Sequence, residues 1–280
     1  MRVRVIVDSS TDVSQRYQNQ IQVVPLTVRF GEEEYFDGVT LDKREFYRKL
    51  VESDALPTTS QATPAMFDTV FRETAAAGDS AVVLTISSAL SGTYQSAVLA
   101  AQGYENIYVV DSKTVAIGAG VLAEYAVELA EQGKQAREIA DILTRKREEV
   151  CVIALLDTLE YLKKGGRISK TVAFAGGVLN IKPVVTVQDG AVALIGKARG
   201  SRNGNNLLVE KIRDCGGVDF EKPLLLGYTG LTEALLDKYV EDSKALWEGH
   251  RETMDRCLLC SVIGTHAGPG AVAVAFFRKG

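Results

Sequence analysis

The sequence predicts an α/β protein with two domains, the first built on a parallel, doubly wound sheet and the second of mixed α+β type. Over the first 150 residues, short apolar runs rich in β-branched residues alternate with helical patterns. This alternation is typical of parallel strands that are covered on both faces. After about residue 150 the alternation is lost and a hairpin pattern occurs. We therefore expect domains at 1–150 and 151–280, with a boundary near 148–152 and no flexible linker.

The first domain is predicted from three apolar runs and the helical patterns around them. The expected strands begin the segments 3–12, 81–93 and 107–120, and the expected helices cover 41–53, 64–78, 93–103, 121–133 and 136–149. Thr63 followed by Pro64 is a typical helix start. A threonine side chain caps the first turn, and proline fits the first helical position because it has no N–H to leave unpaired.

The second domain is predicted as a mixed succession of strands and helices. The expected strands are 151–156, 223–230, 257–263 and 271–279, and the expected helices are 158–166, 171–180, 205–217 and 231–247. Residues 182–200 read as a hairpin with Asp189 and Gly190 at its turn, because an Asp-Gly pair favours the positive φ angles of a tight turn.

Composition and charge exclude several classes of function. The net charge of −4 and the isoelectric point near 5.4 argue against a nucleic-acid-binding surface. The longest apolar runs are far shorter than the ~20 residues of a membrane-spanning helix. We therefore expect a soluble cytoplasmic protein that does not insert stably into a membrane.

The cysteines do not predict a metal site. Cys257 and Cys260 form a C-x-x-C pair, but in the strand expected at 257–263 their side chains would lie on opposite faces. No second pair supplies further ligands, and the chain has two histidines. We expect the four cysteines to be free thiols that pack as small apolar residues.

Hydroxyl-bearing residues gather at the end of the second expected strand. In the stretch TISSALSGTYQSA, residues 85–97, Ser87, Ser88, Ser91 and Thr93 precede or begin a helix. Free backbone N–H groups and the positive end of a helix favour an anion there, and hydroxyls add neutral donors. Helix capping needs only one of the four, so the stretch predicts an anion-binding role for at least one of them.

Other polar residues are candidates for the same site. Thr59 and Ser60 lie in an expected extended loop at 56–67, bounded by prolines, and His266 lies between glycines at the end of the strand expected at 257–263. Arg167 and Arg199 belong to basic loops at the ends of elements, and Arg199 ends a hairpin strand that points to the domain junction.

Absent motifs narrow the chemistry. The chain has no phosphate loop of the G-x-x-x-x-G-K-[ST] type, no G-x-G-x-x-G fingerprint and no G-x-S-x-G elbow. A triad of Ser91, His266 and either Asp8 or Asp111 is formally available. A hydrolase acting on lipid esters therefore remains an alternative at this stage.

Seven segments, read in order, resemble the hallmark segments of the DegV family. They are VDSSTD, PTTSQATP, SSALSGTYQSA, VVDSKTVAIGAG, LDTLEYLKKGGRIS, NIKPVVTVQDG and GTHAGPGAV. The resemblance covers essentially the whole chain. Ala62 and Ala89 depart from it, where proline and glycine are common, and neither change removes a polar group.

The resemblance implies a two-domain protein that holds one long-chain fatty acid in a tunnel between or beneath its domains. In such proteins the fatty acid is presented to a separate ATP-dependent kinase subunit, which converts its carboxylate to an acyl phosphate for phospholipid synthesis. The matching carboxylate-site positions are Thr59, Ser91 and His266, with Ser60 as a further candidate. Arg199, and less directly Arg167, would lie near the site or on the face that docks the kinase.

The residues add two expectations. Hydroxyls and a histidine, without a close buried arginine, are expected to hold the carboxylate. The small apolar segment 171–180 either forms a tunnel wall or packs against the sheet. Two alternatives to a protein that presents its ligand to a kinase stay open: the hydrolase, and a lipid carrier or sensor without a kinase partner. No cofactor and no metal is implied.

Overall fold

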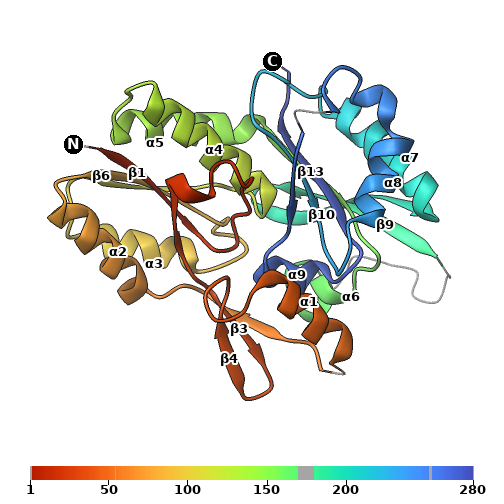
Figure 1. Cartoon of the computed structure of the whole chain (residues 1–280), viewed down its shortest axis with the longest axis horizontal. Coiled ribbons are helices and arrows are strands. Elements are labelled where there is room, and N and C mark those ends of the chain that lie inside the picture. The colour runs from red at the N-terminus through yellow and green to blue at the C-terminus, as the bar shows by residue number, and fades with distance from the viewer. Residues whose placement is uncertain (1, 54, 170–179, 252–253, 280) are drawn as a thin grey trace.

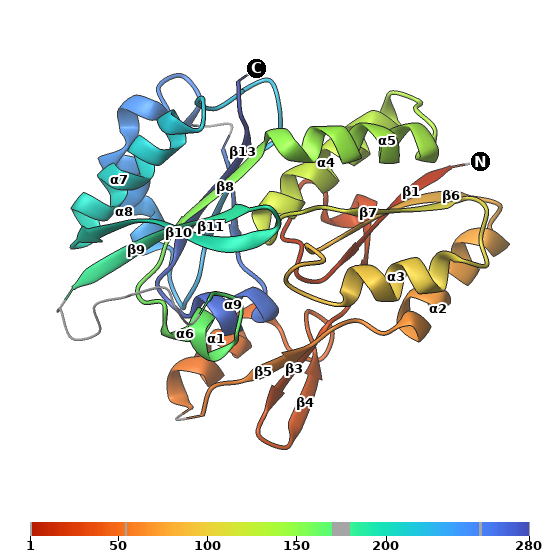
Figure 2. The ribbon, with the colours of Figure 1, turned by 180° about the vertical axis from the view of Figure 1, so that it is seen from behind.

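The computed structural model describes residues 2–53, 55–169, 180–251 and 254–279, whose strands form three sheets (Figures 1 and 2). The strands are β1 (Val3–Asp8), β2 (Ile21–Val24), β3 (Thr27–Phe30), β4 (Glu33–Phe36), β5 (Thr58–Ser60), β6 (Ser80–Thr85), β7 (Ile107–Asp111), β8 (Val150–Leu155), β9 (Ile181–Gln188), β10 (Ala191–Arg199), β11 (Leu224–Tyr228), β12 (Asp255–Leu258) and β13 (Val272–Phe277). The α-helices are α1 (Lys43–Glu52), α2 (Pro64–Ala76), α3 (Thr93–Ala101), α4 (Ile117–Glu131), α5 (Ala136–Lys146), α6 (Glu160–Lys164), α7 (Ser201–Asp214), α8 (Ala234–Asp242) and α9 (Ser261–Ala267).

The first sheet is parallel and doubly wound, as predicted. Its strand order is β2-β1-β6-β7. Alternate side chains of β1 enter different layers: Val5 and Val7 pack with α4 and α5, while Ile6 packs with α2. Strand β2 was not predicted, because a four-residue edge strand gives little periodic signal.

The second sheet is mixed, which confirms the predicted α+β character of this part of the chain. Its order is β10-β9-β8-β13-β11-β12, with antiparallel and parallel neighbours. The predicted hairpin is present, and Asp189 and Gly190 have φ of 50° and 80° at its turn. The two sheets divide along the chain between β7 and β8; the exact domain boundary at 148–152 stays a prediction.

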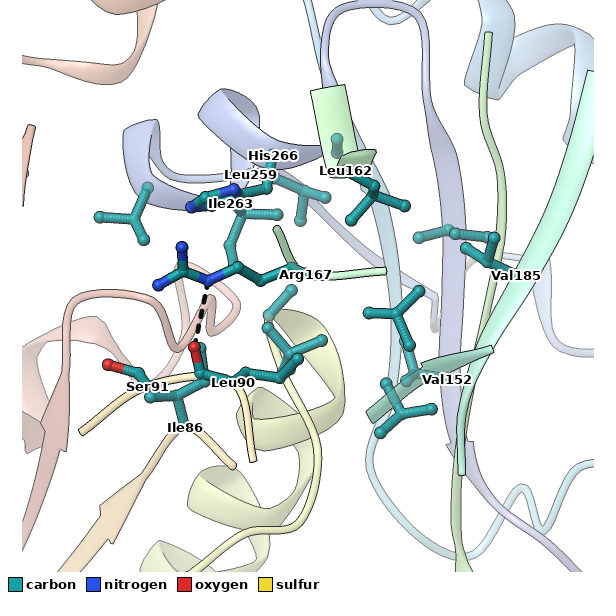
Figure 3. A pocket seen from close by; sticks show the side chains of 18 of the residues that line it. Ile86, Leu90, Ser91, Val152, Leu162, Arg167, Val185, Leu259, Ile263 and His266 are labelled. Atoms are coloured by element: carbon teal, nitrogen blue, oxygen red, sulfur yellow. Dashed lines mark hydrogen bonds between the residues drawn. The ribbon is translucent and has the colours of Figure 1, made fainter. Parts of the chain in front are cut away.

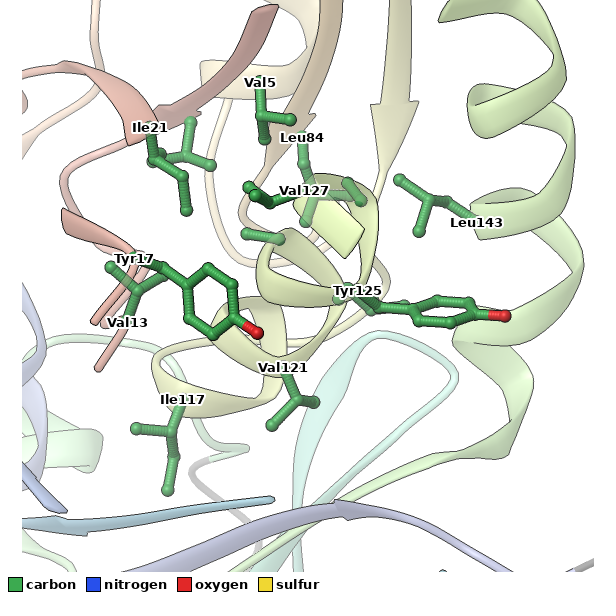
Figure 4. Packing of buried hydrophobic residues seen from close by; sticks show 14 of the residues in the cluster. Val5, Val13, Tyr17, Ile21, Leu84, Ile117, Val121, Tyr125, Val127 and Leu143 are labelled. Carbon is green, nitrogen blue, oxygen red and sulfur yellow. The ribbon is translucent and has the colours of Figure 1, made fainter. Parts of the chain in front are cut away.

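Helix α4 lies between the two sheets and is buried on nearly all sides. Figure 4 shows Val127 of α4 beside Val5 and Leu84 of the first sheet, while Tyr125 points towards α5. Ile117, at the other side of the helix, points towards the second sheet. A helix covered on nearly all sides is mostly apolar, and two of its glutamates have partners: Glu124 accepts from the backbone N–H of Ser14, and Glu128 accepts from the hydroxyl of Tyr17.

A small antiparallel sheet, β4-β3-β5, packs with α1 below the other two (Figure 1). The segment 56–67 was expected to be an extended loop, but its residues Thr58–Ser60 form β5, and Thr59 lies opposite Val28 of β3. Strands β3 and β4, like β2, were not expected. Residues 171–179 of the helix and tunnel wall expected at 171–180 lie outside the described residues, and Asn180 is a turn residue before β9.

The strand expected at 257–263 is wrong beyond Leu258. Strand β12 ends there, and α9 begins at Ser261 with Cys260 as its N-cap residue. His266 is therefore a helical residue, and the argument that placed Cys257 and Cys260 on opposite faces of a strand does not apply. Both thiols are buried. Nowhere in the ranges given above is a helix long and apolar enough to cross a lipid bilayer.

Gly264 in α9 allows α1 to pack closely against this helix. A Cβ atom at position 264 would lie 2.5 Å from Cε1 of Phe46 and 2.7 Å from the hydroxyl oxygen of Tyr47. Both aromatic side chains are fully buried. The glycine at 264 therefore makes room for the two aromatic side chains of α1.

We predict that Gly264→Ala lowers the free energy of unfolding by about 1–3 kcal/mol, the usual cost of overpacking a core. Urea denaturation measures this loss. Gly103→Ala is the matched control, because a Cβ atom there meets nothing within 4 Å. Equal stability of the two variants would show that the contact between α1 and α9 tolerates a methyl group.

Candidate functional site

A pocket lies between the first and second sheets, closed on one side by α9 (Figure 3). It encloses about 940 Å³ of space not filled by protein atoms, its open mouth included. Its walls come from β5, β8, β9, β10, β13, α6, α9 and the turns that follow β6 and β7. Both halves of the chain are therefore needed to build it.

The pocket is polar at one end only. Figure 3 shows Ser91, Arg167 and His266 together on one side and Val152, Leu162 and Val185 on the other. The polar end is lined by Thr59, Ser60, Gln61, Ser91, Arg167 and His266. Elsewhere the lining is apolar except for Thr186, whose hydroxyl donates to the carbonyl oxygen of Val152. This arrangement suits a ligand with a polar head and a long apolar tail.

Thr59 and His266 meet at the polar end although they are far apart in sequence. Oγ1 of Thr59 lies 2.9 Å from Nε2 of His266, and Nδ1 of His266 is buried without a partner among the described residues. Burial, and then the charge of Arg167, lowers the pKa of His266 to about 4. The imidazole is therefore neutral at pH 7.

Arg167 lies beside His266 at the polar end of the pocket (Figure 3). Its Nη1 donates to the carbonyl oxygen of Gly165 at 2.7 Å, and its Nε donates to that of Leu90 at 3.2 Å. The bond to Leu90 links the turn after α6 to the turn before α3. The site was expected to lack a close buried arginine; Arg167 is close and half-buried, and the sequence gave no sign that these two turns face each other.

Of the hydroxyl-bearing residues at 87–93, one lines the pocket and the others stabilise the turn around it. Ser91 lines the pocket, and its Oγ lies 2.9 Å from Oγ1 of Thr93. Ser87 is fully buried outside the pocket lining. Ser88 donates to the carboxylate of Asp111, which fixes the turn after β6. One of the four hydroxyls thus faces the ligand space.

Gln61 belongs to the polar end and was missed at the sequence level. It lines the pocket next to Ser60, and its Nε2 donates to Oγ of Ser96 in α3 at 2.9 Å. The only signal was its place in the TTSQ segment, directly after two other candidates.

Arg199 does not line the pocket. It pairs with Ile181 at the end of the hairpin, whereas the opposite end, at Gly190, lies against Ser87 of the first sheet. The expectation that Arg199 points to the domain junction is therefore wrong. Its other expected role, contact with a partner protein, stays a prediction.

The catalytic triad considered above is not assembled. Asp8 accepts hydrogen bonds from the backbone N–H groups of Ser10 and Ile86, and Asp111 holds the Ser88 turn. Ser91 pairs with Thr93 and not with His266. A Ser–His nucleophile needs the base within hydrogen-bond reach and an acidic group to orient it, and this geometry supplies neither.

The start of α9 is anchored by two buried carboxylates from the first half of the chain. Asp12 accepts from the backbone N–H of Cys260 at 3.1 Å, and Asp37 accepts from that of Ser261 at 3.1 Å. Lys43 donates to Asp12 at 2.6 Å and to the carbonyl oxygen of Leu258 at 2.9 Å. These bonds fix the helix that carries His266.

Comparison with known proteins shows the family. Residues 2–279 match the family model described as "Uncharacterised protein, DegV family". A DegV domain-containing protein of Caldanaerobacter subterraneus is 33% identical over 99% of each chain, and one of Staphylococcus aureus is 31% identical over 98% of each. The chain therefore belongs to the DegV family.

Solved structures share the whole fold. A fatty-acid-binding DegV family protein of Thermus thermophilus matches with a TM-score of 0.87 and 33% identity over 100% of each chain. A stearic-acid-binding protein of Eubacterium ventriosum matches with a TM-score of 0.86 and 27% identity, over 100% of this chain and 99% of the other. DegV of Bacillus subtilis, a fatty acid binding protein, has a TM-score of 0.82 and 27% identity over 100% of each chain.

We predict that Asp12→Asn lowers the free energy of unfolding by about 2–4 kcal/mol, because it leaves the ammonium of Lys43 without its buried counter-charge. Urea denaturation measures the loss. Arg29→Gln, which breaks the exposed pair with Glu34, is the control and should cost less than about 1 kcal/mol. Similar losses in the two variants would contradict the anchoring role of Asp12.

We predict that the free energy of unfolding falls at acidic pH because His266 becomes protonated. Its pKa is lower in the folded than in the unfolded chain, so stability is lost as the pH falls from about 6.5 towards 4. Between pH 7 and 4 the free energy of unfolding should fall about 2–3 kcal/mol more in the parent than in His266→Gln. Parallel pH profiles of the two proteins would show that His266 is not a buried neutral group.

Proposed function

We propose that this protein binds one long-chain fatty acid, with the carboxylate at the polar end of the pocket and the acyl chain in its apolar body. The observation that carries the proposal is the one-ended polarity of a pocket with otherwise apolar walls. Membership of a family whose solved structures include a stearic-acid-binding protein supports it.

The polar end supplies several donors to a carboxylate. A neutral His266 that donates from Nε2 to Thr59 leaves the Thr59 hydroxyl hydrogen to point at the anion. Ser91 adds a second hydroxyl and Arg167 a positive charge at the same end. Hydrogen bonds to a charged group contribute about 1.5–3 kcal/mol each when buried, which is enough to orient the head.

The apolar walls supply most of the affinity. Each methylene buried contributes about 0.8 kcal/mol, so a chain of a dozen or more carbons needs no further polar contact. The walls are built by aliphatic residues of β8, β9 and α9 and by alanines at 154, 267, 271 and 273. Small side chains at these positions leave the space that the acyl chain would occupy.

The surroundings of the polar end support a proposal that the fatty acid is presented to a separate kinase subunit. Thr59, Arg167 and His266 also line a second, outer depression together with Lys164 and Tyr161. The proposed carboxylate thus lies behind a thin wall of side chains that reach the surface. We propose that an ATP-dependent kinase subunit docks there, in the cytoplasm, and converts the carboxylate to an acyl phosphate; exposed Arg199 is a further candidate for docking.

We predict that Thr59→Val weakens fatty-acid binding about tenfold, because it removes the donor and leaves the shape of the side chain. Thr186→Val is the matched control: the same change at the apolar end should alter the affinity less than about threefold. Titration of each protein with a fluorescent long-chain fatty acid gives both dissociation constants. Equal weakening in the two variants would refute the placement of the carboxylate.

The function as a whole is tested by extraction and by reconstitution. Mass spectrometry of lipid extracted from the purified protein should find a long-chain fatty acid; a protein that neither carries nor takes up one overturns the proposal. Addition of a kinase subunit and ATP should then yield acyl phosphate, and Arg167→Gln should slow this transfer more than it weakens binding. Fatty acid without phosphoryl transfer would identify a carrier or sensor.

A further inference from the structure

Two thiols lie side by side outside the pocket. Cys151 belongs to β8, Cys215 follows the last turn of α7, and both side chains pack against the same buried core, where each influences the pKa of the other. Both thiols are partly exposed to solvent. Neither thiol has a part in the site described above.

The backbone brings the two thiols together independently of their side chains. The chain after β13 is hydrogen-bonded to residues two positions away from each cysteine. The N–H of Arg278 donates to the carbonyl oxygen of Glu149, and the N–H of Lys279 donates to that of Gly217. Cys151 itself lies opposite Phe276 in the ladder between β8 and β13. The thiols are thus held by a sheet and a helix end, not by a mobile loop.

Side-chain alternation places this pair on the face of the sheet away from the pocket. Val152 and Ala154 of β8 line the pocket, while Cys151 and Ile153 pack in the core shared with α7. Cys215 packs against the same core. A covalent bond between the thiols would join α7 to β8 without entering the ligand space.

The surroundings of Cys215 favour its thiolate form, which is the form that reacts with an oxidant. The hydrogen bond from Cys151 lowers the pKa of Cys215 to about 7, helped by the charges of Arg278 and Lys211. The same contact raises the pKa of Cys151. Cys257 and Cys260 are buried, and burial raises the pKa of both, so they serve as internal controls.

We propose that Cys151 and Cys215 are a peroxide-sensitive dithiol that forms a reversible intramolecular disulfide. The thiolate sulfur of Cys215 attacks one oxygen of hydrogen peroxide, the O–O bond breaks, and the departing hydroxide is protonated to water. The sulfur of Cys151 then attacks the resulting sulfenic acid, loses its proton and expels a second water. Two thiols are oxidised by two electrons and one peroxide is reduced to two waters.

The test uses the reduced full-length chain. After treatment with a small excess of hydrogen peroxide at pH 7.5, the protein is denatured, alkylated and digested for mass spectrometry. We expect the peptides of Cys151 and Cys215 to be joined and those of Cys257 and Cys260 to be alkylated. Before alkylation, the mass of the whole oxidised protein should be about 2 Da lower than that of the reduced protein, because two hydrogen atoms are lost. Dithiothreitol should restore all four free thiols.

Two variants keep the test decisive. In Cys151→Ser, Cys215 should stop at the sulfenic acid and be trapped by dimedone; in Cys215→Ser, Cys151 should remain reduced. Separate alkylation of both thiols after peroxide would overturn the proposal. So would a disulfide that includes Cys257 or Cys260, or labelling of Cys215 in Cys151→Ser no faster than that of Cys257.

Discussion

Two buried carboxylates from the first half of the chain hold the start of α9, and the geometry of the pocket follows from this anchor. Asp12 and Asp37 accept the backbone N–H groups of Cys260 and Ser261, and Lys43 neutralises Asp12. Buried charges cost free energy unless they are paired and hydrogen-bonded. Lys43 neutralises Asp12 within the first half, and the bonds to Leu258, Cys260 and Ser261 join this buried pair and Asp37 to the second half.

The anchor explains why the polar end of the pocket is assembled from parts that are remote in sequence. α9 packs against α1 at Gly264 and, two residues later, brings His266 to Thr59 of β5. Arg167 ties the turn after α6 to the turn that carries Ser91. The neutral imidazole, the hydroxyls and the guanidinium then surround one end of a space whose other walls are aliphatic.

The parts of the fold that depend on local periodicity were predictable. The alternating strands and helices of the first sheet, the Thr63 cap and the Asp189-Gly190 turn follow from residue patterns alone. The start of α9 did not, since the run before it is strand-like and the carboxylates that accept its first N–H groups lie far away in the sequence, at positions 12 and 37. The candidate site shows the same limit: hydroxyls and a histidine were identifiable by type, but the position of Arg167 depends on two turns that only the tertiary fold brings together.

The central claim is that Thr59 and His266, placed by the anchored α9, contact the carboxylate of a bound fatty acid. The most direct measurement is the ¹³C NMR spectrum of palmitic acid labelled at its carboxyl carbon, bound to the parent protein and to variants. The account predicts one bound resonance that shifts in Thr59→Val and in His266→Gln and stays in place in Thr186→Val. A carboxyl resonance that is the same in all four proteins, or that moves only in Thr186→Val, would contradict it.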